Sequence, residues 1–205
     1  MTQADTSISI TPDEALNRLI EGNQRFVVGF DAPDSFKYQD PALGKHQYPY
    51  ACILGCADSR VSPEHAFDES HGNLFVTRVA GNFVTPEILA SLEYGTSVLG
   101  ASVILVLGHS GCGAVNAAVK AISTDTHFEG HIGQLIDALT PPVEQARHDD
   151  SDRWKKDAVI QNVIQNVSLL RRSEPILSKR VESGQLKVVG GVYNLESGEV
   201  IIIES

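Results

Sequence analysis

Two short cysteine-bearing turns, the second of which also carries a histidine and three glycines, constrain the fold of this chain more than any other sequence feature. The apolar run at 50–55 leads directly into Cys56, and the apolar run at 102–107 leads into Gly108-His-Ser-Gly-Cys-Gly113. Short continuous apolar runs are typical of strands that are buried on both faces of a parallel sheet. Because sites in open α/β sheets form outside the carboxyl ends of the strands, we expect the two turns to be able to meet in space.

Alternating strand and helix signals extend this pattern along the whole chain. Thr11 can cap a helix, Pro12 suits its first position and Glu14 completes a capping box. Helices are expected at 11–28, 85–94, 114–122, 132–139, 152–172 and 176–181, and strands at 50–55, 74–79, 102–107, 186–192 and 200–203. The prolines at 141 and 142 are expected to break the chain. The sequence therefore predicts one α/β domain over residues 1–205, with a central mostly parallel sheet flanked by helices and an N-terminal helical arm at about 11–30.

Length and charge argue against several classes of function. The chain has 205 residues, a net charge of −10 and no basic stripe, so nucleic acid is not an expected partner. Because no run of about 18 apolar residues is present, no membrane span is expected either. The first residues lack the features of a signal or transit peptide, which predicts a cytoplasmic location. Three cysteines in such a chain argue against a disulfide framework and favour metal binding or catalysis.

Cys56, His109 and Cys112 carry the ligand atoms that zinc prefers. Two thiolates and one imidazole leave a fourth coordination position for water, which is the arrangement of a catalytic zinc site. The spacing of His109 and Cys112 lets one turn present two ligands to a single metal ion, and its glycines give it backbone freedom. Asp58 could be the fourth ligand or could accept a hydrogen bond from metal-bound water. Arg60 can hold that carboxylate in a charge-assisted pair.

Other interpretations of the same residues fit the sequence less well. Gly108-His-Ser110-Gly-Cys112 resembles a nucleophile elbow, but a cysteine stands where the elbow needs glycine, and no histidine follows position 148. No Gly-Lys-Ser/Thr follows the glycines, so the turn is not a phosphate-binding loop of that type. Cys52 shares a strand face with Leu54 and is expected to pack in the core. Buried cysteines and histidines are common, so each ligand taken alone also has a purely structural interpretation.

Taken together, these residues resemble the paired signature of the β-class carbonic anhydrases. The signature is the Cys56-Ala-Asp-Ser-Arg-Val61 segment together with Gly108-His-Ser-Gly-Cys-Gly113. Segments 79–82, 166–171 and 190–198 are similar to further parts of the family, and the resemblance spans about residue 12 to the C-terminus. It implies the family fold, a zinc ion on the three ligands named above and an Asp–Arg dyad beside the fourth position.

The resemblance also implies a reaction, the reversible hydration of carbon dioxide to bicarbonate and a proton. A bound zinc can lower the pKa of water from about 15.7 to near 7, and the zinc-bound hydroxide, oriented by the dyad, would attack carbon dioxide. The family further implies a substrate pocket lined by four residues: Gln47, Phe75, Tyr94 and the backbone N–H of Gly113. His46, His65 and His71 are candidates for moving the proton to buffer by residue type only.

A departure from one family pattern bears on the subtype. Some bacterial members bind bicarbonate at an inhibitory site made of a tryptophan, an arginine and a tyrosine. Arg78 and Tyr193 match two of these, whereas Ile53 stands where the tryptophan would be. This puts the inhibitory site in doubt and favours the plant-like subtype, in which Asp58 stays off the resting metal. A move of Asp58 onto zinc at low pH, which would switch the enzyme off, is a hypothesis.

Assembly and alternative functions stay open at the level of sequence. The N-terminal helix carries an apolar stripe, which family members use to clasp a second subunit, so a homodimer or homotetramer is implied. The stripe could instead pack on its own domain. Some relatives hydrolyse carbon disulfide or carbonyl sulfide with the same zinc set. A non-catalytic protein could also hold zinc in a closed structural site with four protein ligands.

Overall fold

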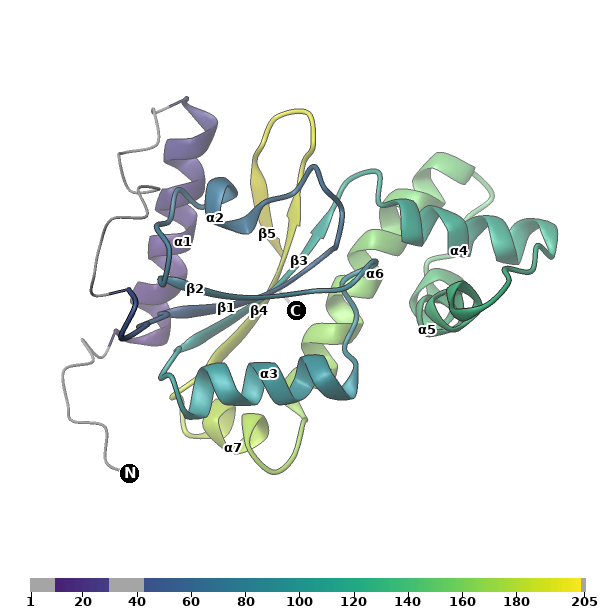
Figure 1. Cartoon of the computed structure of the whole chain (residues 1–205). Helices are drawn as coiled ribbons and strands as arrows, with labels where there is room; N and C mark the ends of the chain where they lie inside the picture. The colour runs from purple at the N-terminus through teal and green to yellow at the C-terminus, as the bar shows by residue number, and fades with distance from the viewer. Residues whose placement is uncertain (1–9, 30–42, 204–205) are drawn as a thin grey trace.

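A five-stranded sheet forms the centre of the molecule in the computed structural model, which describes residues 10–29 and 43–203 (Figure 1). The strands are β1 (Ala51–Gly55), β2 (Leu74–Arg78), β3 (Val103–His109), β4 (Lys187–Tyr193) and β5 (Val200–Ile203), in the spatial order β2-β1-β3-β4-β5. Every neighbouring pair is parallel except β4 and β5, which are antiparallel. The structure confirms the predicted α/β class with its mostly parallel sheet.

Helices cover both faces of this sheet (Figure 1). They are α1 (Pro12–Val27) and α2 (Pro63–Ala66) on one face, and α3 (Pro86–Ser97), α6 (Ser151–Arg171) and α7 (Leu177–Glu182) on the other. Along β1, Ile53 belongs to the core under α1, and Leu54 belongs to the core under α3 and α6. Because successive side chains of a strand point to opposite faces, a strand covered on both sides is apolar throughout.

The remaining two helices form a hairpin beside α6 and beyond the strand ends (Figure 1). They are α4 (Gly113–Thr124) and α5 (His131–Gln145). Helix α6 approaches the sheet closely because glycines face it. A Cβ at Gly108 or Gly190 would lie 2.7 or 2.5 Å from the Val163 side chain. The glycine that opens the metal-ligand turn therefore also brings α6 against the end of β3.

Helix α1 packs on its own domain. The predicted capping box at Thr11 is present, and Ala15 and Leu19 are fully buried in the core of the same chain. Arg18 donates two 2.7 Å hydrogen bonds to the buried carboxylate of Glu69. Part of the stripe thus packs on its own domain, while Val27 and Val28 at the end of the helix stay exposed. The end of the predicted arm, residue 30, lies outside the described residues.

The structure corrects two sequence-based expectations and adds one helix that was not predicted. Strand β3 continues to His109, so this ligand lies on the strand rather than past it. Helix α5 runs through Pro141 and Pro142, where a break was predicted. Leu139, Pro142 and Val143 are all buried there, so packing keeps helical geometry where the prolines remove backbone donors. The short helix α2 was not predicted, because four residues carry no periodic signal.

Among the described residues, no helix combines the length and the apolar character that crossing a bilayer requires.

Candidate metal centre

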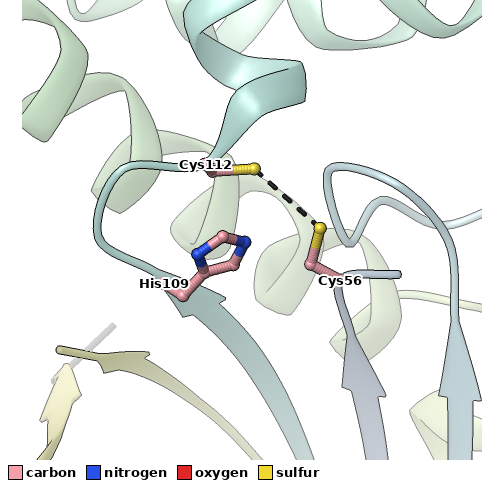
Figure 2. Close-up of side chains that lie close together, drawn as sticks. All are labelled: Cys56, His109 and Cys112. Carbon is pink, nitrogen blue, oxygen red and sulfur yellow. Dashed lines mark hydrogen bonds between the residues drawn. The ribbon is translucent and has the colours of Figure 1, made fainter. Parts of the chain in front are cut away.

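Three side chains converge at the carboxyl ends of β1 and β3. Cys56 directly follows β1, His109 ends β3, and Cys112 is the residue before helix α4. Their ligand atoms, two sulfurs and one imidazole nitrogen, all lie within 4.8 Å of one another (Figure 2). The structure therefore brings together the three residues that the sequence indicated as ligands, although the first two lie 53 positions apart in the chain.

The geometry of this cluster fits a zinc ion. Two Zn–S bonds of about 2.3 Å at a tetrahedral angle would place the sulfurs about 3.8 Å apart, and the Cys56 and Cys112 sulfurs are 4.0 Å apart. The ring of His109 is fully buried, and its Nε2 atom has no hydrogen-bond partner. Its Nδ1 atom lies 3.0 Å from the Ser110 carbonyl oxygen. A proton on Nδ1 satisfies that carbonyl and leaves the Nε2 lone pair available to a metal.

The two cluster thiols shift each other's pKa in opposite directions. Hydrogen bonding from Cys112 lowers the pKa of Cys56 from its ordinary value, and the same contact, with burial, raises the pKa of Cys112. Burial lowers the pKa of His109, but the Cys56 thiolate, the Ser110 carbonyl and the Asp58 carboxylate together outweigh it, so that pKa is raised. Cys112 also sits at the positive end of α4, which favours a thiolate. Without a metal, these groups favour one thiolate, at Cys56, and a bound dication would favour the second at Cys112.

Asp58 and Arg60 form a paired dyad beside the cluster. The Arg60 guanidinium donates to both carboxylate oxygens, at 2.9 and 2.7 Å, and the Arg60 backbone N–H donates at 3.0 Å. These hydrogen bonds, Arg60 first, hold the pKa of Asp58 well below its usual range. One Asp58 oxygen lies 3.8 Å from the free Nε2 atom of His109. An ionised carboxylate, which can only accept hydrogen bonds, therefore faces the open side of the ligand cluster.

Arg78 fixes the turn that carries this dyad. Its guanidinium donates to three backbone carbonyl oxygens of the turn, those of Cys56, Asp58 and Val61, at 2.8, 2.6 and 2.8 Å. The sequence matched Arg78 to an inhibitory bicarbonate site; here three of its N–H donors bind carbonyl oxygens of the turn. Ile53, at the tryptophan position, is fully buried within β1.

Ser110 and Cys52, which the sequence also singled out, have structural roles. Ser110, the serine of the elbow-like motif, accepts a hydrogen bond from the Leu195 N–H at 2.9 Å, and its own N–H donates to the Tyr193 carbonyl oxygen. It thus ties the metal-ligand turn to the end of β4. Cys52 is fully buried in the apolar core, and burial raises the pKa of its thiol to about 12, as expected for a packing residue.

The residues of the predicted substrate pocket are divided between the two ends of the sheet. Gly113 opens α4 beside the metal ligands, and a Cβ there would meet no atom within 4 Å. Phe75 pairs with Cys52 in the sheet and contacts Tyr94, with ring centroids 6.2 Å apart. Gln47 is exposed and lines a 350 Å³ hollow at the amino end. Cys52, the sheet partner of Phe75, is about 13 Å along the strand from Cys56 at about 3.3 Å per residue. One chain therefore does not bring the amino-end pocket residues to its own metal ligands.

Sequence reasoning missed one contact of the cluster. The Gly81 backbone N–H donates to the Cys56 sulfur at 3.3 Å. A backbone donor carries no residue identity, so no sequence signal marks it, although Gly81 falls inside the 79–82 segment that resembles the family.

Comparison with known proteins agrees with this geometry. The family model for carbonic anhydrase matches residues 51–200. Carbonic anhydrase 2 of Mycobacterium tuberculosis is 38% identical over 192 residues, which cover 93% of this chain and 92% of the relative. The solved β-carbonic anhydrase of Coccomyxa, in complex with acetazolamide, superimposes with a TM-score of 0.72 at 30% identity, over 92% of this chain and 86% of that one. The β-carbonic anhydrase CcaA gives a TM-score of 0.72 at 29% identity, covering 92% and 95%.

Fold and site together define a metalloenzyme of the α/β type, with ligands at the carboxyl ends of two parallel strands. This chain belongs to the carbonic anhydrase family and, within it, to the β class. It is accordingly a lyase of that family.

Proposed function

We propose that this chain catalyses the zinc-dependent, reversible hydration of carbon dioxide to bicarbonate and a proton. The observation that carries the proposal is the juxtaposition of the three-ligand cluster with an ionised carboxylate, 3.8 Å from His109 Nε2. Three protein ligands leave a coordination position open, which a catalytic metal needs and a structural metal does not. Carbonic anhydrase 2 of Mycobacterium tuberculosis matches this chain over 92% of its own length, which supports the same assignment.

Cys56, His109 and Cys112 would hold the metal. Two thiolates and an imidazole favour zinc over magnesium or calcium, which prefer oxygen ligands. When bound, zinc lowers the pKa of a coordinated water to near neutrality and so supplies a nucleophile for carbon dioxide. The His109 ring keeps its Nε2 lone pair directed at the cluster because Nδ1 is held by the Ser110 carbonyl.

Asp58 would orient the nucleophile. Its carboxylate accepts the hydrogen of the attacking oxygen and thereby turns a lone pair toward the carbon of the substrate. Arg60 keeps this carboxylate ionised and aimed through two side-chain hydrogen bonds. Arg78 holds the backbone of the same turn in place. Gly113, whose Cβ position is open, leaves room for substrate beside the ligand turn.

We further propose that the active site is completed by a second copy of the chain. Gln47, Phe75 and Tyr94, which the family resemblance assigns to the substrate pocket, lie toward the other end of the sheet from Cys56 in one chain. Tyr94 is 48% exposed and Gln47 is exposed, so both are free to face another subunit. A homodimer, or a homotetramer built from it, would bring these residues to the metal centre of the partner. The cytoplasm is the proposed location, since free thiols suit a reducing compartment.

Stopped-flow hydration with a pH indicator tests the reaction. The protein, with its zinc content measured, would be assayed near neutral pH and one to two units higher. We expect fast, zinc-dependent hydration that is stronger at the higher pH, because more of the nucleophile is deprotonated there. Absence of hydration at both pH values with one zinc per chain would contradict the proposal. Turnover of carbon disulfide or carbonyl sulfide would then identify a sulfur-substrate hydrolase. Inactivity on carbon dioxide and on both sulfur substrates would indicate a closed structural site.

A further inference from the structure

The Cys56 sulfur is held by a backbone donor from outside its own turn. Gly81 lies in the segment 79–85, which connects β2 to α3, and its N–H donates to that sulfur at 3.3 Å. A hydrogen bond to a thiolate withdraws negative charge from the sulfur. It therefore adjusts how strongly Cys56 donates charge to a metal, an effect that groups around the ligands commonly exert.

A buried side chain of α6 fixes Gly81 in this position. The Asn162 amide donates to the Gly81 carbonyl oxygen at 2.8 Å, and Asn162 is only 1% exposed. Gly81 has φ +85°, and a Cβ there would lie 2.8 Å from the Leu139 side chain. Only glycine fits this backbone without strain. Asn162 holds the Gly81 carbonyl oxygen, and the Leu139 side chain of α5 leaves no room for a larger residue.

Asn162 is itself supported by a second buried asparagine. Asn166, one helical turn further on, donates to the Asn162 side-chain oxygen at 3.0 Å and accepts from the Val84 N–H at 2.8 Å. Both amides stand on the buried face of α6, among residues such as Val163 and Val167. Burying two amides costs free energy unless each is paired, and here each one is. The pair thus secures both Gly81 and Val84 of the same connecting segment.

We propose that Asn162 is a positioning residue of the metal centre: by holding Gly81, it maintains the N–H···S hydrogen bond on the Cys56 thiolate. The proposal rests on the metal site proposed above. It assigns Asn162 an influence on the metal that passes through one backbone residue and includes no contact with substrate. Loss of the Asn162 amide would free Gly81, weaken this hydrogen bond and leave more negative charge on the sulfur.

Cobalt(II) substitution reads this influence directly. In a cobalt-loaded protein, the thiolate-to-cobalt charge-transfer band moves to lower energy when the sulfur loses a hydrogen bond, because its lone-pair electrons are then less stabilised. We expect Asn162→Ala to shift the band to lower energy. We also expect it to weaken zinc binding about tenfold, because the freed segment no longer orients the Cys56 sulfur. Thr77→Val is the matched control, because it removes a buried 3.1 Å hydrogen bond to the Ile53 carbonyl oxygen within the sheet. It should lower the Tm and leave both metal readouts unchanged.

Each result has a distinct meaning. An unshifted band and unchanged zinc affinity in Asn162→Ala, with a lowered Tm like that of Thr77→Val, would overturn the proposal and leave Asn162 as a packing residue. An equal shift in both variants would overturn it too, since general destabilisation would then explain it. If Asn162→Ala does not fold, Asn162→Ser is examined by the same readouts and the same criteria. Failure of the unaltered protein to bind cobalt or zinc at all would refute the metal site itself.

Discussion

Strand β1 carries a cysteine in its interior and is followed by another at its carboxyl end, and the two surroundings shift the pKa of the thiol in opposite directions. Cys52 lies inside the strand, is fully buried among apolar residues, and has a pKa raised to about 12 by that burial. Cys56 follows the strand, contacts Cys112 and receives the Gly81 N–H, and its pKa is lowered. Both thiols are almost inaccessible to solvent, so burial alone does not decide reactivity. Polar partners decide it, and the strand end is where loops can supply them.

The strongest test of this contrast removes a ligand at the carboxyl end. We expect His109→Ala to lose its zinc and to hydrate carbon dioxide near the uncatalysed rate, because two thiolates alone do not complete the ligand set. Metal analysis per chain and stopped-flow hydration measure the two effects. A His109→Ala protein that retains one zinc per chain would show that the cluster is not the metal site.

Next in size is the effect of neutralising the carboxylate while keeping its shape. Asp58→Asn should retain zinc and lose about 10²-fold or more in hydration rate, since an amide no longer presents only acceptors to the nucleophile. Asp157→Asn is the matched control, because Asp157 is an exposed carboxylate paired with Arg153 on α6, and that variant should be fully active. Normal turnover in Asp58→Asn would refute the assigned role.

A smaller effect is expected at the amino end of the sheet. Gln47→Ala should lose about tenfold in activity, roughly the value of one hydrogen bond to substrate, with zinc content unchanged. Mixing it with inactive His109→Ala through unfolding and refolding should restore activity. One site of the mixed dimer would then combine an intact ligand set with an intact Gln47. A mixture no more active than its separate parts would argue that each chain works alone.

The smallest effect belongs to the interior of β1. Cys52→Ala should leave zinc content and hydration unchanged and lower the free energy of unfolding by about 1 kcal/mol, as expected for loss of a small buried group. Thermal and denaturant unfolding measure this change. Loss of zinc or of activity in Cys52→Ala would remove the distinction between the two cysteines.

The strand pattern made the fold and the ligand cluster predictable from the sequence. Cys56, His109 and Cys112 follow or end apolar runs, so a parallel sheet brings them to one edge, and the structure does so. The Asp58–Arg60 pair was also predictable, because two residues of separation suffice for contact. These features depend on local spacing and on the rule that sites in open α/β sheets form at the carboxyl ends of the strands.

Other features depend on contacts that no local pattern encodes. The helical course through Pro141 and Pro142 is decided by burial against the rest of the molecule, which overrides proline's preference. Arg78 was matched to a bicarbonate site, and only the structure places its guanidinium on three carbonyl oxygens. The influence of Asn162 passes through a backbone group, which leaves no trace in residue identity.

X-ray absorption at the zinc edge, on the protein in solution near neutral pH, tests the central claim most directly. The account predicts two sulfur neighbours at about 2.3 Å, one imidazole nitrogen at about 2.0–2.1 Å and one further light atom from solvent. Asp58→Asn should leave this shell unchanged, because its carboxylate acts beside the metal and not on it. A shell without two sulfurs, or a light-atom shell whose distances change in Asp58→Asn, would contradict the account.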